Sequence, residues 1–503
     1  MHKPLGIRLD PGLTDPLYRQ LFDQLVARIQ SGTFPARYRL PPSRALAREL
    51  GTHRNTVVRA YEDLEAAGFV LSTVGRGTFV ADRPPAPAGA PPADRGALPG
   101  ASLASHALQA EPLGRSERLA ASGGAGVISL ARMQPSADLL PDDLFRRCMD
   151  HVLRTQRHKA LGYGPREGVP RLRALVAEDL ARQGIPACAD DVVITTGSQQ
   201  ALDLVVRALV NPGDPVLVNE TTYHGALNLL ALGGARILGV PSDEDGPDPR
   251  ALERYGRMGA KLLYLMPNCQ NPIGTRISAE RREALVEWSH AAGVPLVEDD
   301  YASDLHLEPE PPLPALRTLD GEVIYLGTYS KKLIPALRIG YLVCPRALRL
   351  AVGRLKQAMD LGTSALLQHA LAEFLERGYL SPHLAMVRAE YRRRRDALEA
   401  ALRRHLPRSA LWKRPETGVA LWIPAPSGLD VTRLYGEAQR QGVVFSPSML
   451  YEVGGEPRQG LRLTYCAEPV DRLAEGARRL GRAWAVVERH TRTRSPPQQL
   501  EVV

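Results

Sequence analysis

The sequence predicts two folded units of different class, joined by a segment that lacks a regular apolar pattern. Residues 1–82 combine helical spacing of leucines with glycine-containing turns and two β-rich runs, which indicates a small α+β unit. From residue 127 to about residue 489, apolar runs such as VVIT, VPLVED and VIYLG alternate with helical segments, which is typical of an α/β unit with a mainly parallel, two-sided sheet. We expect a Pro/Ala-rich linker at residues 83–126 and a disordered tail at residues 490–503.

The composition is that of an ordinary globular protein with a basic balance. The 503 residues are 44% hydrophobic and 24% charged. The first 80 residues hold 11 Lys and Arg against 7 Asp and Glu, so they carry +4 of the net charge of +9, which favours a polyanionic partner. Five scattered cysteines without a C-x-x-C pair predict neither disulfides nor a zinc site. Without a signal-like N-terminus or a run of about 18 apolar residues, we expect a cytoplasmic protein.

The N-terminal unit is expected to contain a helix-turn-helix. The pair Asp15-Pro16 is a helix start, and leucines then recur at helical spacing. Ser43 is expected to cap a second helix, which ends at Gly51. Only three residues, beginning with that glycine, separate it from a third helix over residues 54–67. Two short helices joined by such a turn are typical of a helix-turn-helix.

The third helix and the segment after it form the expected DNA-contacting surface. A recognition helix places the polar residues of its N-terminus in the major groove or on phosphates. After Gly68, two β-rich runs surround Gly75-Arg76-Gly77, which indicates a wing whose tip arginine suits phosphate or the minor groove. Any one arginine alone more often solvates a helix face, so it is the combined layout that favours DNA binding.

The stretch from Leu40 to Val80 resembles the GntR-type winged helix, and the match covers nearly all of residues 15–81. This resemblance implies double-stranded operator DNA as a partner. It also implies that the following residues face DNA: Ser43, Arg44, Arg54, Asn55, Thr56, Arg59, Arg76 and Gly77.

The large unit carries a lysine motif, GTYSKKLIPALRIGY, directly after an expected strand. Pyridoxal phosphate (PLP) chemistry needs a lysine that forms a Schiff base, with hydroxyl and guanidinium groups near the phosphate. Thr328, Ser330 and Arg338 would supply those phosphate-binding groups. Lys331 and Lys332 are adjacent and point in different directions near a strand end, so we expect only one of them to reach the cofactor.

Two further motifs lie at the carboxyl ends of expected strands, where open α/β sheets bind ligands. Gly197-Ser198-Gln199 stands at a strand-to-helix junction, where backbone N–H groups can hold phosphate. Taken alone, this motif would be an ordinary helix cap. Tyr223 can stack on the pyridine ring, although an isolated tyrosine more often only packs.

Two more motifs can serve the polar edge of a pyridine ring. The Asn271 amide follows a strand and can donate to the ring hydroxyl oxygen, although Asn-Pro is also a plain turn signal. Asp299 ends a strand, where its carboxylate can hold the pyridine nitrogen protonated, and Tyr301 can reach the ring hydroxyl. Glu298 and Asp300 are competing carboxylates for the same role.

In this order, the motifs resemble the fold-type I PLP-dependent aminotransferases over roughly residues 127–489. The resemblance implies an α/β transferase domain with a smaller C-terminal subdomain. Its lysine pattern selects Lys331, and its acid two residues before a tyrosine favours Asp299. Arg462 matches the arginine that binds a substrate α-carboxylate. Tyr163 matches a tyrosine that reaches the phosphate of the neighbouring subunit, which implies a homodimer with shared sites.

One segment departs from the family pattern. In ARMQPSADLLP, Met133 stands where the family carries the glycine of a G-x-P motif. Because this strand lies near the substrate, the known ligand of a relative cannot be transferred to this chain.

The order of winged helix, linker and aminotransferase-like domain resembles the MocR/GabR subfamily of GntR regulators. This resemblance implies a domain-swapped, head-to-tail homodimer with PLP on the lysine. An amine or amino-acid effector would form an external aldimine and shift the DNA-binding state. We expect a regulator with at most residual aminotransferase activity. The alternatives are a working aminotransferase that carries a DNA-binding domain, and a PLP-level sensor that controls cofactor supply.

Overall fold

The computed structural model describes residues 7, 9–10, 16–30, 33–66, 68–73, 77–81, 126–453 and 459–492. These residues form two compact units, one within residues 1–103 and one within residues 104–503. Asp15, Arg76, residues 83–125 of the expected linker and residues 493–503 of the expected tail lie outside the described residues.

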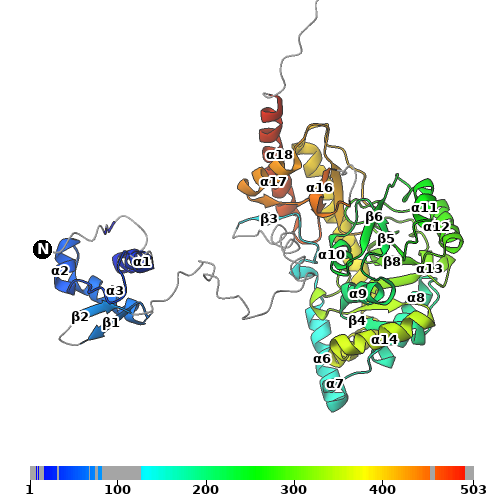
Figure 1. The fold of residues 1–503 in the computed structure, drawn as a ribbon, viewed down its shortest axis with the longest axis horizontal. Helices are drawn as coiled ribbons and strands as arrows, with labels where there is room; N and C mark the ends of the chain where they lie inside the picture. The colour runs from blue at the N-terminus through cyan, green and yellow to red at the C-terminus, as the bar shows by residue number, and fades with distance from the viewer. Residues whose placement is uncertain are drawn as a thin grey trace, which may run out of the picture. The chain divides into compact units, whose positions relative to one another are not determined.

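The N-terminal unit is a bundle of three helices with a two-stranded antiparallel hairpin, in which Val70 pairs with Val80 (Figure 1). Its core contains Leu21 and Leu25 from the first helix and Leu64 from the third. This confirms the expected helix-turn-helix with a wing. The elements are α1 (Leu17–Gln30), α2 (Ser43–Glu49), α3 (Arg54–Ala66), β1 (Val70–Thr73) and β2 (Gly77–Val80).

Helix α2 does not begin with the expected serine cap. Ser43 is the first helical residue, Pro42 is the N-cap, and the Ser43 side chain makes no capping hydrogen bond. The backbone N–H groups of Ala45 and Leu46 donate to the Pro42 carbonyl oxygen at 2.8 and 3.0 Å. The two consecutive prolines keep the chain extended up to Pro42, so its carbonyl is the first to enter the helix. The Ser43 hydroxyl is therefore not used by the cap.

The second unit is built on a seven-stranded sheet with the order β4-β10-β9-β8-β7-β5-β6. Strand β10 is antiparallel to both of its neighbours, and the other adjacent strands are parallel. A mainly parallel sheet is thus confirmed. Its strands are β4 (Val192–Thr195), β5 (Pro215–Asn219), β6 (Arg236–Val240), β7 (Leu263–Leu265), β8 (Leu296–Asp300), β9 (Ile324–Thr328) and β10 (Gly340–Val343).

Helices cover both faces of this sheet (Figure 1). In β5, Val216 and Val218 pack in a core with Ala201 of α9, whereas Leu217 packs in a separate core with Leu285 of α12. Successive side chains of a strand point to opposite faces, so the continuous apolar run reflects burial on both sides. The helices are α6 (Asp142–Thr155), α7 (His158–Leu161), α8 (Pro170–Arg182), α9 (Gly197–Leu209), α10 (His224–Leu232), α11 (Pro249–Gly256), α12 (Ala279–Ala292), α13 (Leu316–Leu319), α14 (Arg346–Asp360) and α15 (Ala365–Glu376).

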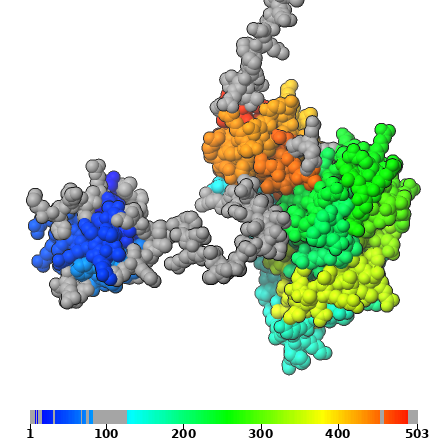
Figure 2. All heavy atoms as spheres, viewed as in Figure 1, coloured from blue at the N-terminus to red at the C-terminus, as the bar shows by residue number. Residues whose placement is uncertain are grey.

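A smaller C-terminal subdomain packs directly against the rest of the unit, with its orange residues beside the green ones in Figure 2. Its three-stranded sheet has the order β11-β14-β13, and β3 (Ile128–Ser129) pairs in parallel with β12. The first strand of the unit is therefore part of the subdomain that the last residues form. The other elements are α16 (Leu380–His405), β11 (Ala420–Pro424), α17 (Val431–Arg440), β12 (Val443–Val444), β13 (Ser446–Pro447), β14 (Gly460–Thr464) and α18 (Val470–Arg492).

Helix α18 continues past the expected end of the domain at residue 489. Its buried residues Leu480, Trp484 and Val487 keep an apolar face along the subdomain core. No proline interrupts the chain before Pro496, so the helix extends through Arg492. None of the described helices is both long and apolar enough to cross a lipid bilayer.

Candidate cofactor and DNA sites

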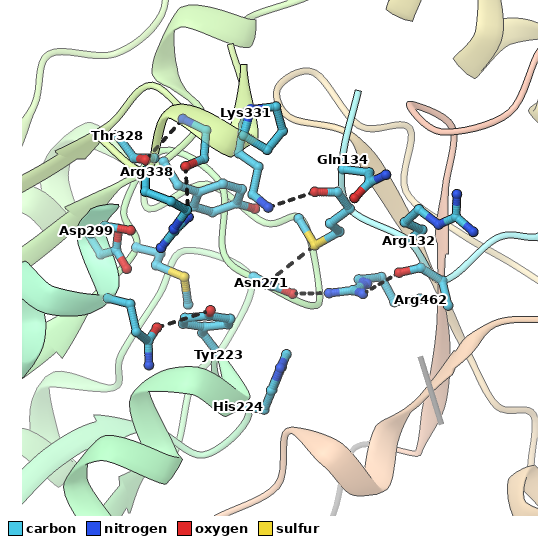
Figure 3. Close-up of a pocket in the computed structure, with 18 residues that line it drawn as sticks. Arg132, Gln134, Tyr223, His224, Asn271, Asp299, Thr328, Lys331, Arg338 and Arg462 are labelled. Carbon is cyan, nitrogen blue, oxygen red and sulfur yellow. Dashed lines mark hydrogen bonds between the residues drawn. The ribbon is translucent and has the colours of Figure 1, made fainter. Parts of the chain in front are cut away.

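A cavity of about 520 Å³ opens where the carboxyl ends of β8 and β9 face the C-terminal subdomain (Figure 3). Every residue that the sequence placed at the cofactor within one subunit lines this cavity. These residues are Ser198, Gln199, Tyr223, Asn271, Asp299, Tyr301, Thr328, Ser330, Lys331, Arg338 and Arg462.

The two adjacent lysines point to different places. The Lys331 ammonium group lines the cavity and donates to the Met133 carbonyl oxygen at 2.7 Å. Burial, aided by the charges of Arg462 and Arg338, lowers the pKa of Lys331 to about 8. Lys332 is buried away from the cavity, where its ammonium group pairs with the Asp304 carboxylate.

The three consecutive carboxylates at the end of β8 also separate. Asp299 lines the cavity, and its Oδ2 accepts a 2.6 Å hydrogen bond from the Tyr264 hydroxyl. Its Oδ1 is buried and has no hydrogen-bond partner among the described residues. Asp300 accepts from the Tyr325 hydroxyl at 2.7 Å, and Glu298 accepts from two backbone N–H groups at 3.0 and 3.1 Å. Of the three, only Asp299 therefore offers an oxygen to a ligand in the cavity.

Burial and the neighbouring Asp300 charge raise the pKa of Asp299 to about 6, although the Tyr264 hydrogen bond opposes this shift. A cation placed against the buried Oδ1 would supply the missing partner and favour the carboxylate form. The protonated nitrogen of a pyridine ring is such a cation.

The N-terminus of α9 forms one end of the cavity. Gly197 has a φ of +77°, and a Cβ there would lie 2.5 Å from the Arg338 guanidinium. A Cβ on Gly340 would lie 2.7 Å from the backbone nitrogen of Ser198. Glycines at both positions let β10 and Arg338 approach the helix N-terminus closely. The Arg338 guanidinium also donates to the Ser330 hydroxyl at 3.3 Å, so a cation, hydroxyls and a helix N-terminus gather at one place.

Two tyrosines line the middle of the cavity. The Tyr223 hydroxyl donates to Gln199 Oε1 at 3.3 Å, and Gln199 Nε2 donates to the Gly225 carbonyl oxygen at 3.0 Å. The Tyr301 hydroxyl donates to Cys269 Sγ at 3.3 Å. Together with Lys331, Asp299 and the α9 N-terminus, these side chains fit the amine, ring and phosphate requirements of PLP.

The opposite end of the cavity holds Arg462 on β14. Its guanidinium donates to Asn271 Oδ1 at 2.9 Å and to the Ala131 carbonyl oxygen at 3.0 Å. Further lining residues that sequence reasoning did not assign are Ala131, Arg132, Met133, Gln134, His224, Met266 and Pro335. The departure from the family pattern at Met133 could have identified these wall residues, because it lies in the segment 131–134 that lines the cavity.

His224 follows Tyr223 directly and begins α10. Burial and the charges of Arg462 and Lys331 lower its pKa to about 4, so the imidazole is neutral near pH 7. Its Nδ1 is buried without a hydrogen-bond partner among the described residues. No sequence motif pointed to this residue.

Tyr163 does not line the cavity. Its side chain is 90% exposed, and Leu161, Met359 and Leu361 nearby in the chain or fold are exposed as well. The segments that follow Leu161 and Leu361 approach each other, because a Cβ on Gly164 would lie 3.3 Å from the Cβ of Ala365. Exposed apolar side chains of this kind are common where a protein contacts another chain.

The predicted DNA-contacting residues lie at or near the surface of the N-terminal unit. These residues come from α2, the start of α3 and the hairpin. The exposed ones are Arg44, Arg54, Asn55 and Arg59, and the half-buried ones are Ser43, Thr56 and Gly77. The Arg59 guanidinium lies 3.8 Å from the centroid of the Tyr18 ring and donates to its hydroxyl at 3.2 Å. Tyr18 thereby orients Arg59 on this surface.

Two family models match this chain. The model for bacterial regulatory proteins of the gntR family matches residues 17–80, and the model for aminotransferase class I and II matches residues 132–480. A probable rhizopine catabolism regulatory protein, MocR, of Rhizobium meliloti is 34% identical over 486 residues, which are 95% of this chain and 96% of that protein. The chain belongs to the MocR-type regulators of the GntR family.

The aminotransferase-like domain of this MocR-type regulator is also similar to free enzymes. The 2-aminoadipate transaminase of Thermus thermophilus is 38% identical over 365 residues, which are 71% of this chain and 90% of that enzyme. The crystal structure of an alpha-aminoadipate aminotransferase from the same species, complexed with N-(5'-phosphopyridoxyl)-L-leucine, has a TM-score of 0.71 and 35% identity, and covers 77% of this chain and 98% of that one. The domain thus belongs to a PLP-binding family.

Proposed function

We propose that this MocR-type regulator holds PLP on Lys331 and binds DNA according to whether an amine or amino-acid effector has displaced that lysine. The observation that carries the proposal is the cavity itself, in which the Lys331 amine and the buried Asp299 carboxylate face the same space. A helix-turn-helix with exposed basic residues stands in the same chain.

PLP, when bound, supplies an aldehyde that captures amines and a ring that withdraws electrons. Lys331 is suited to that aldehyde because its lowered pKa of about 8 leaves a useful neutral fraction near pH 7. The Asp299 carboxylate would keep a proton on the ring nitrogen. The α9 N-terminus, Thr328, Ser330 and Arg338 would hold the phosphate, and Tyr223 would cover the ring face.

The effector would bind at the other end of the cavity. The Arg462 guanidinium is positioned for an α-carboxylate, because its planar fork matches two carboxylate oxygens. Asn271 already contacts Arg462 and would donate its amide to the ring hydroxyl oxygen, with Tyr301 beside it. An effector amine could then exchange with Lys331 while its carboxylate is held.

The second subunit would complete the site. The exposed Tyr163 side chain fits the role of a residue that reaches the phosphate of the partner subunit. The exposed apolar side chains of Leu161, Met359 and Leu361 also fit a homodimer contact. We propose the domain-swapped, head-to-tail homodimer that the MocR/GabR resemblance implies.

The N-terminal unit would bind double-stranded operator DNA. Arg54, Asn55 and Thr56 at the start of α3 would enter the major groove, and Arg59, oriented by Tyr18, would reach a phosphate. Ser43 and Arg44 on α2, and Arg76 and Gly77 in the wing, would contact the backbone or the minor groove. An effector can alter this binding only if it favours one conformer of the dimer over the other.

The test combines two measurements on the full-length protein. The visible absorption of the lysine-held cofactor is followed while a panel of amines and amino acids is added, and operator affinity is measured with each. We expect at least one compound to shift the absorption and to change the operator affinity severalfold, at matching concentrations. If compounds that shift the absorption leave operator affinity unchanged, effector control of DNA binding is refuted.

A working aminotransferase is the second candidate, favoured by the likeness to 2-aminoadipate transaminase and by the complete set of cavity residues. Multiple turnovers with an amino donor and a keto acid would support it over a pure regulator. DNA binding that responds to PLP alone, without any amine, would instead support a sensor of cofactor supply.

A further inference from the structure

The wall of the cavity between Lys331 and Arg462 is the segment Ala131–Gln134, and its backbone is fixed at three successive carbonyls. The Ala131 oxygen accepts from the Arg462 guanidinium at 3.0 Å, and the Met133 oxygen accepts from the Lys331 ammonium group at 2.7 Å. The Arg132 oxygen accepts from Cys466 Sγ at 3.6 Å. The Cα of Arg132 is therefore held between the two groups that would bind the amine and the α-carboxylate of an effector.

The cations that line the cavity differ in their partners. Lys331, Arg338 and Arg462 each donate to an oxygen within the cavity wall. The exposed guanidinium of Arg132 makes no hydrogen bond or ion pair with any described residue, although the residue lines the cavity. Asp299 is the one carboxylate among the lining residues, and it stands at the far end, away from Arg132 and Arg462 (Figure 3). Among the described lining residues, Arg132 is thus a cation without an anion at the effector end.

Two buried polar atoms at this end also lack partners. Arg462 Nε and His224 Nδ1 have no hydrogen-bond partner among the described residues. Buried polar atoms without partners require an explanation, and a ligand with several acceptor atoms is one. The neutral His224 imidazole cannot balance a second anion, so among the described residues that line this end the second cation is Arg132.

We propose that the effector is an amino acid whose side chain carries a second anionic group, and that Arg132 binds this group. The proposal rests on the proposed function, because it assumes that the α-carboxylate occupies Arg462 and the amine displaces Lys331. When the amine and the α-carboxylate of the effector are both bound, its side chain begins close to the Arg132 backbone, which the hydrogen bonds above hold in place. The long arginine side chain is exposed at its head and can turn to meet a carboxylate or a similar anion with two parallel hydrogen bonds.

The test uses pairs of amino acids that differ in charge but hardly in size: glutamate against glutamine, and aspartate against asparagine. Each is titrated into the full-length PLP-bound protein, and its affinity is read from the change in cofactor absorption. A second reading needs no reaction at the cofactor: the rise in Tm caused by glutarate is compared with that caused by butyrate. We expect one acid to bind about tenfold or more tightly than its amide, because charge-assisted hydrogen bonds carry such differences.

Two variants assign the effect to Arg132. Arg132→Gln is expected to weaken the acid about tenfold, to leave its amide unchanged and to remove the advantage of glutarate over butyrate. Arg354→Gln is the matched control, because Arg354 is an exposed arginine of α14 that does not line the cavity, and it should change none of these values.

Equal affinity for acids and amides, or an Arg132→Gln variant that weakens both alike, overturns the inference. An amine without a second anion that shifts both absorption and operator affinity more strongly than every acid also overturns it, while the proposed function stands. If no amine of any kind alters absorption or operator affinity, the proposed function fails, and the inference fails with it.

Discussion

The two ends of the cavity differ in the kind of chain that forms them. At the Asp299 end, the functional groups stand on the ends of β8 and β9 and on the N-terminus of α9, all positions that the sheet determines. At the Arg132 end, they stand on the irregular segment 131–134, on the first residue of α10 and on β14 of the C-terminal subdomain. The first end can therefore be shared by proteins with different ligands, whereas the second can change residue by residue without disturbing the sheet.

The largest expected effect is at the Asp299 end, where the two adjacent lysines can be separated. Lys331→Ala should abolish the visible absorption of the lysine-held cofactor, because the amine that faces the cavity is removed. Lys332→Ala should retain that absorption but lose roughly 3 kcal/mol of stability, since it leaves the Asp304 carboxylate without its buried partner.

Absorption spectra and thermal unfolding of both variants would check this contrast. A Lys331→Ala protein that keeps the absorption, or a Lys332→Ala protein that folds but loses it, would show that the lysine assignment is wrong.

A smaller effect is expected from pH, and it also concerns the Asp299 end. Cofactor capture requires the neutral Lys331 amine, and with a pKa of about 8 the neutral fraction rises about tenfold between pH 7 and pH 9 and then levels off. The pKa of Asp299, about 6, keeps its carboxylate ionised over this range. An unperturbed lysine would instead gain about a hundredfold over the same two units and continue to rise.

Stopped-flow capture of PLP by the cofactor-free protein would measure this profile. Nα-acetyl-lysine in solution is the reference for an unperturbed amine. A capture rate that climbs steadily to pH 10 without a plateau would contradict the lowered pKa.

The smallest expected effect is at the other end. Met133→Gly removes the side chain that approaches the Asn271 amide, with Sδ 3.7 Å from Nδ2, and so enlarges the effector end of the cavity. We expect long amino-acid side chains to gain roughly threefold to tenfold in affinity relative to short ones, while the cofactor stays bound. Titration of a homologous series into the wild-type and variant proteins measures this ratio. An unchanged ratio would mean that Met133 does not limit the effector.

The residues predicted from the sequence are mostly those of the Asp299 end. Gly197 and Lys331 each follow an apolar strand and Asp299 lies near the end of one, and parallel strands bring their carboxyl ends to one edge of the sheet. Because of that geometry, motifs that follow one another along the sequence come together around one cavity. The choice of Asp299 over its neighbours needed the family pattern, and the alternation along β8 gives its physical reason.

The residues that sequence reasoning missed lie where no periodic pattern exists. His224 begins α10 and Gln134 lies in an irregular segment; both line the cavity because of how the chain packs in three dimensions, which a linear pattern does not encode. Arg132 stood next to the noted departure at Met133 but carried no motif of its own. The prediction that Ser43 caps α2 was wrong for a local reason, because Pro42 occupies the N-cap position. The role of Tyr163 stays a prediction, because it concerns a second subunit.

The short strand β3 connects the segment 131–134 to the C-terminal subdomain. Ile128 donates to the Gly442 carbonyl oxygen at 3.0 Å and Leu130 donates to that of Val444 at 2.8 Å, so the chain is clamped to the C-terminal subdomain immediately before it reaches the cavity. Met133, whose carbonyl holds the Lys331 amine, is only seven residues from Gly126, where the described part of this unit begins. The backbone that accepts the hydrogen bond of the Lys331 amine is therefore continuous, through β3, with the residues that precede Gly126 in the sequence and join this unit to the helix-turn-helix.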